Sequence, residues 1–156
     1  MTTQDAVIQI NTGVKHIKIE RDGQETFTLE FNPSDSLFAE KFYALIGEFE
    51  AKQVEFEQRA DEIDAEKGKE QNGLDINTPE RLRLVRDAAE FINHKIDYVF
   101  GAGASHGMFG DVINLDVYSQ FFDQITPYIR KARTDKIAKY SNPNPPPKKP
   151  GRNRHK

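Results

Sequence analysis

Apolar and polar residues alternate along the first part of the chain. In residues 17–19 and 27–31 every second residue is Ile, Leu or Phe, and the residues between them are polar. A period of two places alternate side chains on opposite faces of a β-strand. Asp22-Gly23, between the two runs, supplies the positive backbone dihedrals that a tight turn requires. The pattern predicts a β-hairpin, with a third short strand over residues 7–10.

The spacing of apolar residues then changes to three and four, which is the period of an amphipathic helix. Ser34 or Asp35 can accept hydrogen bonds from the first free amides of such a helix. We expect this helix over about residues 35–71, ended by Asn72-Gly73. Its apolar stripe thins after Phe49, so its second half should project from the body or form one arm of an antiparallel pair.

A second helix is expected over residues 79–100, with Thr78 as its cap. Pro79 fits the first helical position, where its missing amide costs little. The helix should pack against the first one as an αα-hairpin, because it has the most regular apolar stripe of the chain: Leu82, Val85, Ala89, Ile92, Ile96 and Val99.

A third long helix is expected over residues 115–140, capped by Asn114 or Asp116. Pro127 should kink or restart it, because proline cannot donate its amide and crowds the preceding turn. Together these elements predict one α+β domain over residues 1–140, mostly α-helical, with a hairpin or small antiparallel sheet followed by three to four helices.

Composition limits the class of protein further. Hydrophobic residues make up 37% of the chain and charged residues 30%, which allows a compact but thin core. The chain has no cysteine, which excludes disulfides and thiol chemistry. No run approaches the roughly 18 apolar residues of a membrane helix, and the N-terminus lacks the pattern of a secretory signal. We expect a cytoplasmic protein that does not bind membranes.

Charge is distributed unevenly along the chain. Residues 141–156 carry five prolines and no acidic residue, and we expect this tail to be disordered. The 17 basic and 25 acidic residues of the remainder give it a net charge of -8. Only the tail could therefore neutralise nucleic-acid phosphates, through its five basic side chains, Lys148, Lys149, Arg152, Arg154 and Lys156.

A glycine-rich stretch, residues 99–111, raises the question of a phosphate-binding loop. Its glycines depart from the dinucleotide-binding spacing, and no lysine follows them as a phosphate-binding loop requires. The preceding segment also has the period of a helix, whereas both nucleotide motifs follow a strand. The spacing and the context both argue against a nucleotide site.

The same stretch contains the adjacent pair Ser105 and His106. Neighbouring side chains diverge, so a catalytic pair would need a partner brought in by the fold. His94 and His106 have no acidic helix partner at metal-binding spacing, and surface positions explain them better. The carboxylates of residues 48–66 alternate with Lys and Arg, as on a solvated helix face. We therefore expect no enzyme and nominate no catalytic residue, cofactor or metal.

Two interpretations of the glycine-rich stretch remain. It is either a buried connector between two helices, which we favour, or a partner-binding loop whose apolar residues anchor in another chain. Gly101 is expected to end the second helix in the left-handed conformation. The candidate partner-binding residues are the large apolar side chains of this region and the helix that follows: Phe100, Met108, Phe109, Phe121 and Phe122.

The order of these parts resembles that of tail assembly chaperones from long-tailed phages of Gram-positive bacteria. The resemblance covers most of residues 16–140 and includes the hairpin sequence FTLEFNPSDS. Its most specific pieces are Val99-Phe100-Gly101 with Phe109-Gly110-Asp111, and Pro127-Tyr128-Ile129 followed by Lys131-Ala132-Arg133.

The resemblance implies a non-enzymatic protein of the host cytoplasm that is absent from the mature virion. Such chaperones coat the apolar helices of the tape-measure protein and recruit tail-tube subunits. An acidic, helix-rich body is compatible with that role, because amphipathic stripes can bind helices in a groove. The alternative is a nucleic-acid-associated or scaffolding phage protein that acts through the basic tail. Self-association is left open, because the stripes could close within one chain or between copies.

Overall fold

The computed structural model describes residues 4–141, with side-chain surroundings for residues 4–134. This part of the chain contains two antiparallel strands followed by four helices, which confirms the predicted α+β, mostly helical class. The expected tail lies outside the described residues except for Ser141. The elements in chain order are β1 (Lys15–Arg21), β2 (Gln24–Phe31), α1 (Ser36–Asp64), α2 (Thr78–Phe100), α3 (Ala104–Phe109) and α4 (Asp116–Ser141).

The hairpin forms as the sequence predicts. Its turn consists of Asp22 and Gly23, which both have positive φ, and it pairs Arg21 with Gln24. The register shifts between Ile19 and Glu20, which is a β-bulge. The face that carries the alternating apolar residues packs against the core, and the opposite face is exposed to solvent.

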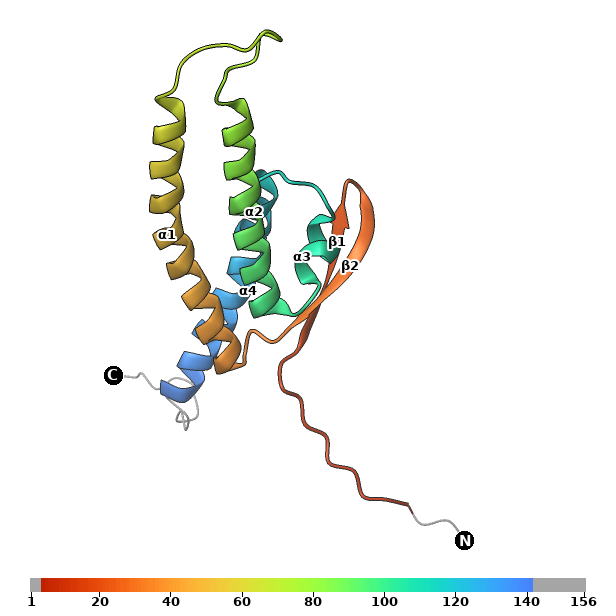
Figure 1. The fold of residues 1–156 in the computed structure, drawn as a ribbon. Coiled ribbons are helices and arrows are strands. Elements are labelled where there is room, and N and C mark those ends of the chain that lie inside the picture. The colour runs from red at the N-terminus through yellow and green to blue at the C-terminus, as the bar shows by residue number, and fades with distance from the viewer. Residues whose placement is uncertain (1–3, 142–156) are drawn as a thin grey trace, which may run out of the picture.

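The third strand predicted over residues 7–10 is wrong for the single chain. Residues 4–14 form no strand, and this segment extends from the hairpin away from the body (Figure 1). Asn32 Nδ2 donates to the carbonyl oxygen of Thr12 at 2.8 Å. Gly13, at a φ of 99°, lies so close to Ser34 that a Cβ atom there would be 2.8 Å from its Oγ. These contacts hold the segment on a path away from the sheet.

Helices α1 and α2 run side by side and antiparallel, as predicted (Figure 1). Asp35 caps α1 by accepting a hydrogen bond from the amide of Leu37 at 2.9 Å. The helix ends at Asp64 rather than near residue 71, so its predicted end is wrong. Several carboxylates lie in its last turns with no basic residue in the last turn, and they oppose the helix dipole there.

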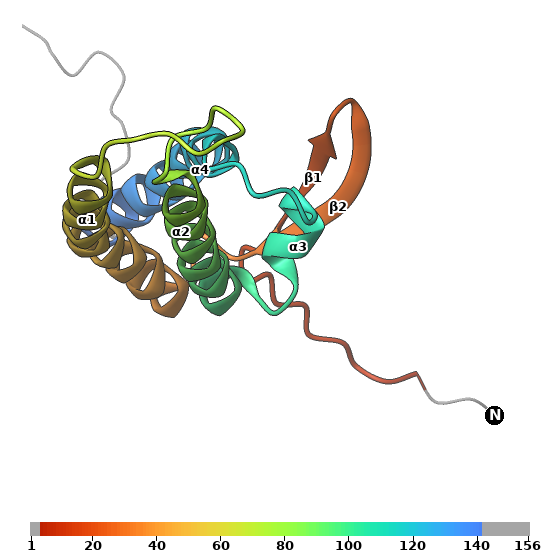
Figure 2. The ribbon, with the colours of Figure 1, turned by 45° about the horizontal axis from the view of Figure 1, so that its top comes forward.

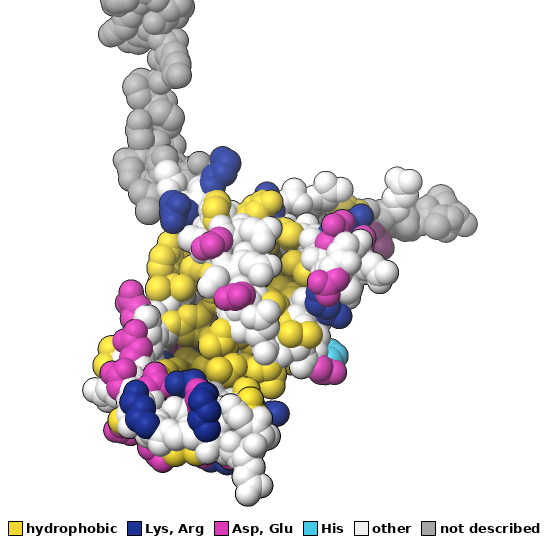
Figure 3. Space-filling model, turned by 90° about the horizontal axis from the view of Figure 1, so that it is seen from above, with side chains coloured by type: hydrophobic (Ala, Val, Ile, Leu, Met, Phe, Trp, Pro, Cys, Tyr) yellow, Lys and Arg dark blue, Asp and Glu magenta, His cyan; other side chains and the backbone are white. Residues whose placement is uncertain are grey.

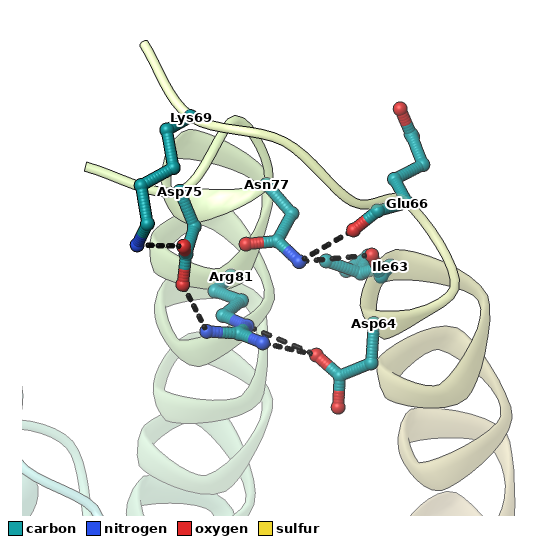
Figure 4. Close-up of polar contacts among 7 residues, drawn as sticks. All are labelled: Ile63, Asp64, Glu66, Lys69, Asp75, Asn77 and Arg81. Atoms are coloured by element: carbon teal, nitrogen blue, oxygen red, sulfur yellow. Dashed lines mark hydrogen bonds and ion pairs between the residues drawn. The ribbon is translucent and has the colours of Figure 1, made fainter. Parts of the chain in front are cut away.

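Asn77 joins the two helices at their free end. Its Nδ2 donates to the carbonyl oxygens of Ile63 and Glu66 at 3.2 and 3.3 Å, so it satisfies the end of α1 from the start of α2 (Figure 4). Asn77, not Thr78, is the residue that precedes α2, which corrects the predicted cap. The Asn77 side chain is buried, and its Oδ1 has no partner within the described residues.

Charged residues fasten the loop of residues 65–77 around this joint. Arg81 binds Asp64 at 2.7 Å and lies 3.7 Å from Asp75 (Figure 4). Lys69 binds Asp75 at 2.9 Å, and this hydrogen bond and charge lower the pKa of the Asp75 carboxyl. Each such exposed pair contributes little by itself, so the group organises the loop more than it stabilises the fold.

The glycine-rich stretch contains a short helix, α3, that the pattern did not predict. Gly101 ends α2 with a φ of 116°, but its ψ of 151° lies outside the left-handed helical region that we expected. Asp97 then accepts a hydrogen bond from the first turn of α3, at the amide of Ser105, over 2.8 Å. Asp97 thereby fixes where α3 begins relative to α2.

Helix α3 packs closely against the inner face of the hairpin (Figure 2). Gly107 is the point of contact, because its Cα faces the ring of Phe27 with no room for a side chain. The Gly107 carbonyl oxygen accepts hydrogen bonds from Arg21 Nη1 at 3.3 Å and Thr26 Oγ1 at 3.4 Å. Both strands therefore donate a hydrogen bond to the same residue of α3.

Helix α4 crosses the α1–α2 pair on the side that faces away in Figure 1 (Figure 2). Asn114 Oδ1 accepts a hydrogen bond from the amide of Asp116 at 3.0 Å, so Asn114 serves the start of the helix as one of the two predicted caps. The helix continues through Pro127, so of the two expected outcomes, a kink or a restart, the restart is wrong. Its buried side chains recur at three and four residues: Tyr118, Phe121, Ile125 and Ile129.

Phenylalanine rings form the centre of the core. The ring of Phe100 lies 5.4 Å from that of Phe38, 5.9 Å from Phe31 and 5.3 Å from Phe121, measured between centroids. These partners belong to α1, β2 and α4, and all three pairs are edge to face, an arrangement that aromatic quadrupoles favour. Phe100 thus joins four elements.

We expect Gly107→Ala to destabilise the protein by about 1–3 kcal/mol, because the added methyl group overlaps the ring of Phe27. Gly47→Ala is the matched control. Gly47 lies at an exposed position of α1 with open space around it, so alanine there should stabilise the protein by about 0.5–1 kcal/mol. Urea unfolding measures both changes. A Gly107→Ala variant as stable as the parent chain would contradict the close packing of α3 on the hairpin.

Candidate binding surfaces

A groove of about 660 Å³ separates β1 from α4. One wall is the run of consecutive residues 17–22 of the hairpin, and the other includes Val117, Gln124 and Tyr128. Consecutive strand residues point to opposite faces, so a wall that includes all of them is the strand's edge. The groove therefore exposes the free edge of β1.

Three of the five candidate partner-binding residues also line this groove, namely Met108, Phe109 and Phe121. All three are buried against the core, so they form its floor and do not protrude as anchors. Their placement agrees with the connector interpretation of the glycine-rich stretch. The apolar floor nevertheless suits a segment laid along the groove.

The other two candidates lie elsewhere. Phe100 is buried at the centre of the core and has no free surface to offer. Phe122 is half-buried on the other side of α4, where its ring lies 5.3 Å from that of Phe49. The five residues therefore belong to one core but not to one surface.

The structure does not bring Ser105 and His106 together. Ser105 is buried, whereas the His106 side chain is largely exposed and places its Nδ1 3.3 Å from Asp111 Oδ1. Within residues 4–134, no three His, Asp or Glu side chains gather as a metal site would require. No helix in the part of the chain that the structure describes is long and apolar enough to cross a membrane.

A second surface follows the stripe of α2 beyond the core. Ile96 is fully buried and Ala89 nearly so, but Val85 is half-buried and Leu82 is 66% exposed. These residues share one helix face, so their exposure increases where no other element packs on that face. The sequence pattern placed Leu82 on the stripe that faces the core, and the prediction that Leu82 packs there is wrong. We call Leu82 and Val85 the open stripe.

The start of α4 packs on this face of α2 and buries it. Tyr118 donates its hydroxyl to Asn93 Oδ1 at 2.8 Å, which places the first turn of α4 beside the middle of α2. Leu82 lies eleven residues before Asn93, or about 16 Å along the helix. The open stripe therefore lies beyond the reach of α4, on the part of the pair that projects from the body.

Apolar side chains gather in a hollow on the face seen from the free end of the α1–α2 pair, beside the Lys and Arg side chains of that end (Figure 3). At the margin of the core, α1, α2 and α4 carry half-buried apolar residues: Ile46, Phe49, Ile92 and Phe122. Apolar surface is thus shared between the projecting pair and α4. An exposed apolar patch of this kind is typical of an interaction site.

Ion pairs hold the projecting pair together without covering its apolar surface. Arg59 binds Asp87 at 2.9 Å, and Lys95 binds Glu48 at 2.8 Å, each across the two helices. The ammonium of Lys52 lies 5.4 Å from the centroid of the Phe91 ring, a cation–π distance. Together these contacts hold α1 and α2 side by side beyond the core, so the open stripe lies on an ordered surface.

Comparison with known proteins identifies the family. The model described as "Family of unknown function (DUF6673)" matches residues 25–156. The chain belongs to family DUF6673. The match begins within β2, so the N-terminal segment and β1 of this DUF6673 chain lie outside it. No curated protein and no solved structure matches the chain.

Burial of Tyr118 links the attachment of α4 to pH. Burial raises the pKa of its phenol above the ordinary value, about 10, although the hydrogen bond to Asn93 acts in the opposite direction. The folded DUF6673 chain therefore holds this proton more tightly than the unfolded chain. The resulting stability is complete below about pH 10 and is lost as the pH rises through the folded pKa.

We expect the parent chain to lose stability between about pH 10 and pH 12 more steeply than Tyr118→Phe, which has no phenol to ionise at this position. Urea unfolding across this range measures the difference in slope. Tyr43→Phe is the control, because it removes the same hydroxyl group from an exposed position. Parallel curves for the parent chain and Tyr118→Phe would show that burial of this phenol is not linked to folding.

Proposed function

We propose that this protein is a non-enzymatic assembly chaperone that covers apolar helices of a partner protein. Following the resemblance in its sequence, the partner is the tape-measure protein of a long-tailed phage, and the covered complex recruits tail-tube subunits. The protein would act in the host cytoplasm and be absent from the mature virion. This role requires an apolar surface that is held open and no reactive group.

The open stripe is the observation that carries the proposal. It continues the buried stripe of α2 on the same face, but nothing within the described residues covers it at Leu82. An amphipathic helix binds such a surface through apolar residues repeated at three and four positions. A client helix laid beside α2 would extend the packing that α4 provides nearer the core.

The shape of the molecule favours this use of the stripe. Helices α1 and α2 form before any client arrives, fastened by Asn77 and by ion pairs between them. A surface that is already ordered loses little conformational freedom on binding, so more of its apolar contact contributes to affinity. The hollow beside the projecting pair provides further apolar contacts (Figure 3).

The client that fits this surface is therefore an apolar or amphipathic helix. Half-buried phenylalanines such as Phe49 and Phe122 supply contact area of the kind that dominates binding energy at interfaces. Charged side chains on the rim would exclude unrelated partners more than they would add affinity. This division suits a chaperone that must later release its client.

We expect co-expression with this chain to keep a helical fragment of the tape-measure protein from the same genome in solution. Leu82→Asp should reduce this effect and weaken binding about tenfold, because it places a charge where a client side chain would pack. Pull-down and isothermal titration with the purified pair measure the change. The fold should be unaffected, because Leu82 is exposed.

Val54→Asp is the matched control for this experiment. Val54 lies on the same projecting pair and is 56% exposed, but it falls outside the apolar stripe of α1. The Val54→Asp variant should bind the fragment as tightly as the parent chain does. The proposal fails if the fragment is equally soluble without this chain, or if both variants weaken binding alike.

A further inference from the structure

The N-terminal segment, residues 5–10, has the sequence of a strand but no partner. Val7, Ile8 and Ile10 are 77%, 86% and 78% exposed, more than any apolar side chain of comparable size elsewhere in residues 4–134. We propose that this segment adds as a β-strand to the open edge of β1 in a second copy of the chain. Two copies would exchange their segments and form a closed dimer.

The receiving site is the groove between β1 and α4. Within the described residues β1 pairs only with β2, so its other edge presents unpaired amide and carbonyl groups. An exposed edge of this kind is a template for an added strand. A two-stranded hairpin is also marginally stable by itself, and a third strand would strengthen it.

The side-chain pattern of the segment fits the groove. In an added strand, Ala6, Ile8 and Ile10 point to one side and Val7 and Gln9 to the other. The floor of the groove is apolar, with Met108 and Phe109 beneath the strand edge. The face that carries Ile8 and Ile10 would therefore pack on the floor, and the face that carries Val7 and Gln9 would point to solvent.

The segment's own β1 is a poor recipient. To lie along it, the chain would have to reverse direction within residues 11–14. That reversal would break the 2.8 Å hydrogen bond from Asn32 to Thr12 and move Gly13 away from Ser34. The segment instead points away from the body and can reach the groove of another copy (Figure 1).

Charge also favours this occupant. The only charged residue within residues 4–14 is Asp5, whereas β1 carries Lys15, Lys18 and Arg21 against one acidic residue, Glu20. The single carboxylate of the segment would meet a strand of net positive charge, which favours their association. Reciprocal exchange uses the same two surfaces on both copies, so the assembly closes at two chains and leaves no free segment.

Light scattering coupled to size exclusion tests the exchange on the full chain. The parent chain should have twice the mass of one copy, and Ile8→Lys should reduce the mass to that of one copy. Gln9→Lys is the matched control, because the same charge on the outward face should leave the dimer intact. Leu82→Asp should also leave it intact, since the open stripe plays no part in the exchange.

A peptide of residues 4–14 provides the second measurement. Fluorescence anisotropy should show that it binds a chain that lacks residues 2–11. The same peptide with both Ile8→Pro and Gln9→Pro should not bind, because one of two consecutive amides must face β1 and proline cannot donate there. The proposal is overturned if the full chain is a single copy up to about 100 µM, or if Ile8→Lys keeps the dimer. Peptide binding by a full chain that stays monomeric would overturn it as well.

Discussion

The arrangement of the elements depends on the ring of Phe100. It comes at the last residue of α2 and contacts aromatic residues of β2, α1 and α4 at the same time. Because α2 ends there, the chain can turn directly into α3, which carries the hairpin on Gly107. One side chain therefore sets where the sheet, the helical pair and α4 meet. A residue that looks suited to partner binding by its size serves the interior instead.

Local periodicity was sufficient for most elements of this fold. The hairpin, its Asp22-Gly23 turn and the antiparallel helical pair follow from spacing and from a few turn and cap residues. The end of α1 could not be predicted in this way, because its last carbonyls are satisfied by Asn77 from the far side of the loop. Likewise, residues 7–10 have the pattern of a strand, but pairing depends on Asn32, which holds Thr12 on a different path.

The candidate surfaces were less accessible to sequence reasoning than the fold. Periodicity identifies which face of a helix is apolar, but it does not tell where along the helix another element stops covering that face. Leu82 and Ile96 therefore look alike in the sequence, although one is exposed and the other is buried. Met108 and Phe109 were found by type, yet their role as the floor of a groove depends on β1 and α4, which are distant in sequence.

The ring contacts of the core extend along the helical pair as far as Phe56 and Phe91. Residues 57–87, beyond them, contain no aromatic residue, and the joint at Asn77 closes this end of the pair. Its length is therefore free to change in evolution without disturbing the interior. Inserting or removing matched helical turns in both helices would preserve the stripe and the joint while moving the tip. The end of the pair therefore has the geometry of a spacer of adjustable length, and length differences between members of the family are expected first within residues 57–87.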